Sequence, residues 1–145
     1  MDTLRLPAQL KYLEQFHSFV LQKVEQWNLP LSMVMKLELI MEEVLTNVFK
    51  YAYPGTEGEV ELGLVYRNMG AEMLITVCDW GLAFNPLEKT EPDLLEDIES
   101  RKIGGLGIHM VRHMVERLEY HREGDMNVLS ITLAVPQPES RDAKE

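Results

Sequence analysis

The sequence predicts an α/β (α+β) fold of two layers, in which three helices cover one face of a mostly antiparallel mixed sheet of four or five strands. Apolar residues recur at helical spacing in three segments and alternate with a period of two in others. The chain of 145 residues, 46% of them hydrophobic, is long enough for one ordinary core. We therefore expect a single domain over residues 1–136 and a polar tail over residues 137–145.

Charge and composition narrow the class of protein. The 24 acidic residues outnumber the 14 basic ones, and the net charge of −10 repels nucleic acid and anionic membranes. The single cysteine, Cys78, excludes an intramolecular disulfide and a cysteine zinc cluster. The amino terminus lacks an apolar signal core, and no segment approaches the ~18 apolar residues of a membrane span. We expect a cytoplasmic protein without nucleic-acid or membrane partners, in which a cation helps to hold any phosphate ligand.

Two helices are predicted in the first part of the chain. A short extended piece ends at Pro7, and helical spacing then runs from Tyr12 to Trp27. Asn28-Leu29-Pro30 interrupts this spacing, and a second helix follows until Tyr53-Pro54-Gly55 stops it. The apolar stripe of the second helix consists of Leu37, Met41, Val44 and Val48.

The central part of the chain predicts a hairpin. Residues 59–67 alternate between apolar and polar side chains, which is typical of a half-buried strand. Asn68-Met69-Gly70 is suited to connect this strand to residues 72–79. The second strand is apolar almost throughout, so we place it near the middle of the sheet.

The segment from 87 to 103 is longer than most connections in compact domains. It is rich in carboxylates, follows Pro86 and contains Pro92, and it shows little apolar periodicity. We interpret it as a functional lid over a ligand site. The alternative is a solvated loop with a short helix around residues 93–100.

A third helix and a second hairpin complete the predicted fold. The helix is expected over residues 108–118, and the hairpin joins residues 119–122 to residues 127–135 through a turn at Gly124-Asp125. The core-facing residues of this helix are Ile108, Val111, Val115 and Leu118.

Three polar residues follow one another on the second helix. Glu43, Asn47 and Lys50 are spaced i, i+4 and i+7, so they lie within about 60° of arc on one face. A carboxylate and an amide oxygen one turn apart suit a hard cation such as Mg²⁺, and the lysine is suited to meet a phosphate. The alternative is a solvated helix face that carries a charge pair.

Asp79 ends the most apolar strand. It alternates in phase with Ile75 and Val77, so its carboxylate is expected to point inward, where a buried charge needs partners. The exocyclic amine of adenine is such a partner, and Gly81 permits close approach of the backbone to a ligand. The alternative is a carboxylate that caps the turn at Gly81.

Glycines 104, 105 and 107 precede the third helix. Free N–H groups and the positive end of the helix dipole favour a phosphate there. The segment lacks the Gly-Lys-Ser/Thr of a Walker loop and the third glycine of a dinucleotide fingerprint. The alternative is a flexible hinge or an ordinary helix start.

Taken in order, these segments resemble three motifs of one superfamily. Residues 43–53 resemble the N-box, residues 79–86 the first glycine box and residues 104–108 the second glycine box of the ATP-binding (Bergerat fold) superfamily shared by DNA gyrase, histidine kinases and bacterial anti-sigma-factor serine kinases. The resemblance covers nearly the whole chain. The compact length and the last strand, residues 127–133, are most similar to the anti-sigma kinase branch.

The resemblance implies a site for Mg·ATP. It implies that Glu43 is the general base, that Asn47 binds Mg²⁺ and that Asp79 contacts adenine. Either Arg101 or Lys102 would bring a positive charge from the lid to the terminal phosphate. The further nucleotide-binding positions that it implies are Lys50, Gly81, Phe84, Gly104, Gly105, Leu106, Gly107 and Thr132.

The resemblance also implies a function. We expect an ATP-dependent serine/threonine kinase that phosphorylates an anti-sigma antagonist protein and also binds a sigma factor, and we leave a homodimer open. Ala83 stands where many members have glycine, and Lys50-Tyr51 replaces a histidine-containing sequence. The alternative is therefore a module of the same fold that binds a partner with ATP but without turnover. A detached histidine-kinase domain is a third interpretation, which phosphohistidine on a partner would reveal.

Overall fold

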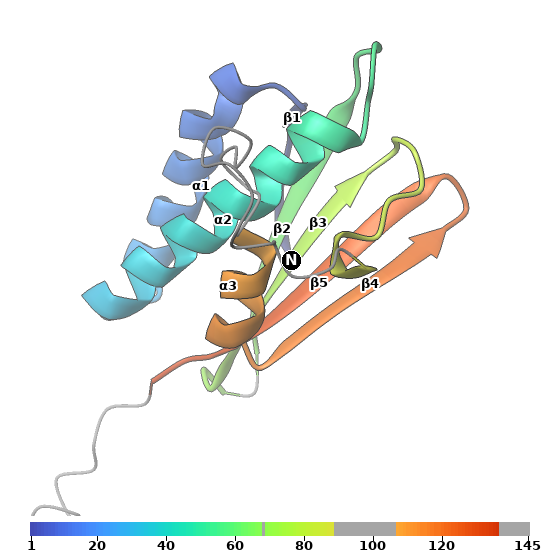
Figure 1. The fold of residues 1–145 in the computed structure, drawn as a ribbon. Coiled ribbons are helices and arrows are strands. Elements are labelled where there is room, and N and C mark those ends of the chain that lie inside the picture. Colours follow the sequence, from blue (N-terminus) through green and yellow to red (C-terminus); the bar gives the residue numbers. More distant parts are fainter. Residues whose placement is uncertain (68, 89–106, 137–145) are drawn as a thin grey trace, which may run out of the picture.

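The computed structural model describes residues 1–67, 69–88 and 107–136. Five strands form one sheet in the order β1-β2-β3-β5-β4, and three α-helices cover one of its faces (Figure 1). Every pair of neighbouring strands is antiparallel. The predicted fold of two layers, with the helices on one face of the sheet, is confirmed. The elements are β1 (Asp2–Pro7), η1 (Leu10–Tyr12), α1 (Leu13–Gln26), α2 (Leu31–Tyr51), β2 (Glu59–Arg67), β3 (Glu72–Asp79), η2 (Pro86–Glu88), α3 (Gly107–Met114), β4 (Arg117–Glu123) and β5 (Met126–Ala134).

The break between α1 and α2 lies where the sequence predicts it. Asn28 has a φ of 53°, the left-handed conformation that commonly ends a helix. The N–H of Leu29 returns to the carbonyl of Val24 at 3.2 Å, which satisfies one of the last carbonyls of α1. Pro30 is extended and therefore directs the chain into α2.

The core fills the space between the helices and the sheet. Burial alternates strictly along β3, because one face of this strand meets the helices. Burying each large apolar side chain contributes roughly 1.5–3 kcal/mol. The largest core side chains, each no more than 1% exposed, are Phe16, Leu37, Ile40, Leu45, Leu62, Leu64, Met73, Ile75, Ile131 and Leu133.

The third helix is shorter than the sequence predicts. α3 ends at Met114, and β4 already begins at Arg117, so the prediction of a helix to Leu118 is wrong. The N–H of Glu116 donates to the carbonyl of Thr132 at 3.0 Å, and Leu118 pairs with Ile131 of β5. Leu118 nevertheless packs against the core, which explains why its spacing is compatible with a helix.

Two predicted segments fall largely outside the described residues. They are the lid, of which only Leu87 and Glu88 are described, and the tail over residues 137–145. Within the described ranges, no helix combines the length and the apolar character that crossing a membrane requires.

Candidate functional site

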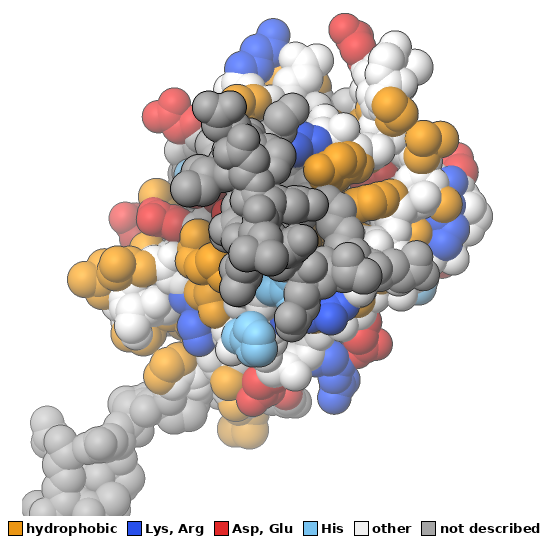
Figure 2. Space-filling model, in the orientation of Figure 1, with side chains coloured by type: hydrophobic (Ala, Val, Ile, Leu, Met, Phe, Trp, Pro, Cys, Tyr) orange, Lys and Arg blue, Asp and Glu red, His pale blue; other side chains and the backbone are white. Residues whose placement is uncertain are grey.

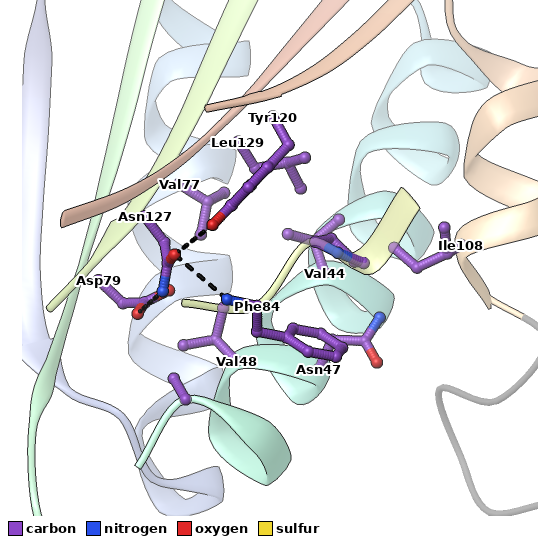
Figure 3. A pocket seen from close by; sticks show the side chains of 12 residues that line it. Val44, Asn47, Val48, Val77, Asp79, Phe84, Ile108, Tyr120, Asn127 and Leu129 are labelled. Carbon is purple, nitrogen blue, oxygen red and sulfur yellow. Dashed lines mark hydrogen bonds between the residues drawn. The ribbon is translucent and has the colours of Figure 1, made fainter. Parts of the chain in front are cut away.

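A pocket lies between α2 and the end of the sheet that carries Asp79 (Figure 3). It contains about 400 Å³ of empty volume, part of which is open to solvent. A mainly apolar wall with a few polar groups is typical of small-molecule sites. The lining residues are Val44, Asn47, Val48, Ala52, Val77, Asp79, Phe84, Pro86, Ile108, Tyr120, Asn127 and Leu129.

The carboxylate of Asp79 is buried at the end of β3, with 5% of the residue exposed, so the predicted inward phase is confirmed. Its Oδ1 accepts from the N–H of Gly81 at 2.9 Å and from the side-chain amide of Asn127 at 2.8 Å. The carboxylate thus caps the turn at Gly81 through one oxygen, and its second oxygen, Oδ2, has no hydrogen-bond partner within the described ranges.

Asn127, which is not among the residues that the sequence predicts for the site, fixes this carboxylate. The side chain is 4% exposed, and its Nδ2 donates to Asp79 and, at 2.7 Å, to the carbonyl of Leu82. These contacts hold both the carboxylate and the loop after β3, because a buried amide is costly unless it is paired. Its Oδ1 accepts from Tyr120 Oη at 2.6 Å, Arg122 Nη1 at 3.1 Å and the Phe84 N–H at 3.4 Å (Figure 3).

Thr132 takes no part in this arrangement. Asn127 pairs with Asp79 across β3 and β5, and it shares its face with Leu129. Thr132 has the opposite phase on β5, so its side chain points away from the pocket. The prediction that Thr132 is the polar residue of the last strand at the pocket is therefore corrected: the structure places Asn127 there. Its inward phase with Leu129 is a signal that the sequence already contains.

Gly81 allows the loop after β3 to lie against the end of α2. A Cβ at this position would come within 2.0 Å of the carbonyl oxygen of Ala52. The same carbonyl accepts from the N–H of Leu82 at 2.8 Å, and Arg122 Nη1 donates to the carbonyl of Gly81 at 2.8 Å. The close approach that the sequence predicts is thus to another part of the protein backbone.

Replacing Gly81 with alanine is expected to lower stability by about 1–3 kcal/mol, the usual cost of overpacking. The loop must also move, so the affinity for ATP should fall. Gly55 provides the control, because a Cβ there meets nothing within 4 Å although its φ is 73°. Thermal unfolding should reveal destabilisation in both variants, whereas calorimetry should show weaker ATP binding only for Gly81→Ala. Equal ATP affinity in the two variants would contradict this role for Gly81.

Two polar side chains of α2 contain buried atoms that have no hydrogen-bond partner in the described part of the chain. Asn47 is 3% exposed, and among the described residues neither its Oδ1 nor its Nδ2 has a hydrogen-bond partner. The buried Oε2 of Glu43, one turn earlier, has none either. An unsatisfied buried polar group costs about 1–3 kcal/mol, so these atoms point to a ligand. An amide oxygen near a carboxylate fits Mg²⁺, which takes few protein ligands and keeps waters or phosphates for the rest.

The surroundings of Glu43 favour its protonated form. Burial raises the pKa of its carboxyl group, and the negative charge of Glu42 raises it further, while Lys50 acts in the opposite direction. Lys50 is exposed and lines a second pocket beside Thr46, so the structure does not bring it to the wall of the Asp79 pocket. Glu43 is therefore a carboxylate of increased basicity.

The remaining predicted positions are only partly described. Phe84 lines the pocket, and its ring stacks on Tyr51 with the centroids 5.1 Å apart. Gly107 is the first residue of α3, and Ile108 behind it lines the pocket. The predicted positions outside the described residues are Arg101, Lys102, Gly104, Gly105 and Leu106.

Comparisons with known proteins agree with this geometry. Residues 6–133 match the family described as histidine kinase-like ATPase domain. The chain is 30% identical over 97 residues to the serine/threonine-protein kinase BtrW of Bordetella bronchiseptica, covering 66% of this chain and 67% of that protein. It is 26% identical over 129 residues to the serine-protein kinase RsbW of Listeria monocytogenes, covering 84% of this chain and 80% of that protein.

A solved structure shows the same fold. The blue-light activated histidine kinase of Erythrobacter litoralis EL346 superposes with a TM-score of 0.55 at 20% identity. The match covers 74% of this chain and 32% of that kinase, so the chain spans about a third of its length. The chain therefore belongs to the histidine kinase-like ATPase domain family, in the branch of the anti-sigma-factor serine kinases that its motifs resemble.

Proposed function

We propose that this protein binds Mg·ATP and transfers the terminal phosphate to a serine or threonine hydroxyl of an anti-sigma antagonist protein. The observation that carries the proposal is one pocket with two kinds of unused polar atoms. The Oδ2 of Asp79 and the amide of Asn47 both lack partners among the described residues. The names of the two curated relatives, both protein kinases, support the reaction type.

The pocket suits an adenine base. Apolar side chains of α2, β3 and β5 supply surfaces for a flat ring, and the Oδ2 of Asp79 is an acceptor for its exocyclic amine. Asn127 and Gly81 occupy the other carboxylate oxygen, so Asp79 cannot rotate without losing two hydrogen bonds. This fixed acceptor favours adenine over guanine, which presents a carbonyl at the corresponding position.

The phosphate groups of ATP need positive charge, which the apolar adenine end of the pocket does not supply. On the face drawn in Figure 2, the basic side chains of the described residues are scattered among acidic ones and form no continuous basic surface. The net charge of −10 favours a metal ion as the group that balances the phosphate charge, and Asn47 would hold it through Oδ1. When bound, Mg²⁺ supplies the positive charge on which phosphoryl transfer depends.

Glu43 lies one helical turn before Asn47 and acts on the acceptor. We propose that its Oε2 accepts the proton of the serine or threonine hydroxyl as the hydroxyl oxygen attacks the terminal phosphorus. The bond between that phosphorus and the bridging oxygen breaks at the same time, and ADP leaves. Burial raises the pKa of Glu43, which makes it a better proton acceptor than an exposed carboxylate. The charge of Lys50 acts in the opposite direction on the same pKa and favours the ionised form, which is the form that accepts a proton.

Replacing Asn47 with alanine is expected to remove the effect of Mg²⁺ on ATP affinity. The loss should reach at least about 10- to 100-fold, the range found when the support of a metal site is removed. Calorimetry of ATP binding with Mg²⁺ and with a chelator measures this effect. Asn47→Asp is the matched control, since it keeps an oxygen ligand. A full Mg²⁺ effect in Asn47→Ala would exclude Asn47 as the metal ligand.

The partners follow from the proposed reaction. We propose that the protein also binds a sigma factor in the cytoplasm, and that phosphorylation of the antagonist decides which partner it holds. Incubation with ATP labelled on the terminal phosphate and with antagonists encoded beside this protein tests the reaction. Transfer of label supports a kinase. ATP-dependent partner binding without transfer would instead indicate a binding module of the same fold.

A further inference from the structure

The sheet opens directly after Asp79. The antiparallel ladder between β2 and β3 ends with the pair of Val60 and Asp79, and the same register would next place Glu59 opposite Trp80. The hydroxyl of Tyr53 lies between these two residues instead. It accepts from the N–H of Trp80 at 2.8 Å and donates to the carbonyl of Glu59 at 2.5 Å. The Tyr53 hydroxyl thus takes the place of one backbone hydrogen bond, that is, one rung of the ladder between β2 and β3.

Tyr53 is held firmly in this position. Its ring lies so close to Gly58 that a Cβ there would come within 2.0 Å of Tyr53 Cε1. Burial raises the pKa of the Tyr53 hydroxyl, so the group stays protonated and can donate and accept at once. The ring of Trp80 is held as well, because the guanidinium of Arg5 lies 3.9 Å from its centroid.

The residue before Tyr53 holds the next part of the same loop. The carbonyl of Ala52 accepts from the N–H of Leu82, and Gly81 packs against Ala52 without room for a side chain. Ala52 and Tyr53 therefore fix three consecutive residues after Asp79. These two residues follow α2 directly, and α2 carries Asn47. The adenine end of the pocket is thus tied to the helix that holds the proposed metal ligand.

We propose that Tyr53 is a positioning residue of the nucleotide site, whose hydroxyl keeps the sheet open by one rung so that Gly81 turns onto α2 and Asp79 presents Oδ2 to adenine. This inference rests on the proposed nucleotide binding. Without the hydroxyl, the N–H of Trp80 is free to pair with the carbonyl of Glu59, because both groups need a partner. The ladder would then extend by one pair and turn Gly81 away from Ala52.

Tyr53→Phe tests the inference, since it removes the hydroxyl and keeps the ring against Gly58. Calorimetry should show an ATP affinity lower by about tenfold, which corresponds to the net value of one hydrogen bond. The preference for ATP over GTP should become smaller as well, because the orientation of the Asp79 carboxylate changes. Tyr66→Phe is the matched control at the far end of β2, where Tyr66 stacks on Trp27, and it should change neither quantity.

A merely structural role for Tyr53 would lower the unfolding temperature and leave nucleotide selectivity unchanged. All titrations are therefore made far below the unfolding temperature of each variant. An unchanged ratio of ATP to GTP affinity in Tyr53→Phe, with wild-type protein binding ATP, would overturn this inference but not the proposed function. Absence of ATP binding by the wild type would overturn the proposed function itself. Gly58→Ala, which displaces the Tyr53 ring, provides a second variant with the same expected loss of affinity.

Discussion

Replacing Glu43 with glutamine is expected to slow phosphotransfer by about 10²- to 10⁴-fold while ATP affinity is retained. Glutamine keeps the size and polarity of the side chain but cannot take the proton of the acceptor hydroxyl. Single-turnover transfer of labelled phosphate measures the rate, and calorimetry measures the affinity. Glu42→Gln is the matched control, because Glu42 points about 100° away from Glu43 on α2. It removes only a secondary contribution to the pKa of Glu43, so it should slow transfer far less than Glu43→Gln does. Undiminished transfer by Glu43→Gln would refute the role of Glu43 as base.

The difference in stability between the wild type and Glu43→Gln should depend on pH with a defined sign, because only the wild type carries a titrating group at this position. The fold raises the pKa of Glu43 above its ordinary value of 4.5, so the folded protein binds this proton more tightly than the unfolded chain does. The stabilisation by the protonated group is complete below the ordinary pKa and is lost as pH rises through the raised pKa. At pH 7 Glu43→Gln should therefore unfold at the same temperature as the wild type or a higher one. Any advantage of the variant should shrink as pH falls toward 4.5.

Replacing Asp79 with asparagine is expected to remove the preference for ATP over GTP. A site built around a hydrogen bond discriminates against a ligand that lacks it by up to ~10⁴-fold, and Asp79 Oδ2 is the proposed acceptor. The variant retains an oxygen for the bonds from Gly81 and Asn127, so the loop should keep its position. Asp125→Asn makes the same chemical change in an exposed turn and should leave ATP binding unchanged. Equal affinity of the wild type for ATP and GTP would remove Asp79 from adenine recognition.

The sequence predicts those site residues whose position follows from local periodicity. Asp79 is inward because it alternates with Ile75 and Val77, and Asn47 is buried because it lies about one turn after Val44 and directly beside Val48. Asn127 obeys the same rule, but no local pattern indicates its role, because its contacts to Asp79 and Phe84 join residues 48 and 43 positions apart. The resemblance implies Thr132, whereas the phase of Thr132 on β5 places its side chain on the opposite face of the sheet.

Other features could not be predicted because tertiary pairing determines them. Val115 and Leu118 have a spacing that suits a helix, yet pairing with β5 makes β4 begin at Arg117. Likewise, the sequence predicts only that Tyr53 helps to end the second helix. Its hydroxyl in fact bridges Glu59 and Trp80, which are 6 and 27 positions away. Local patterns define which face a side chain occupies, whereas hydrogen bonds between distant segments depend on the assembled sheet.

The chemical nature of the transferred phosphate tests the account most directly. The wild-type chain is incubated with Mg·ATP, labelled on the terminal phosphate, and with candidate antagonist proteins. The account predicts acid-stable phosphoserine or phosphothreonine on one antagonist, formed in the wild type and lost in Glu43→Gln. Acid-labile phosphohistidine, or label that stays on ATP while the chain binds its partner, would contradict it.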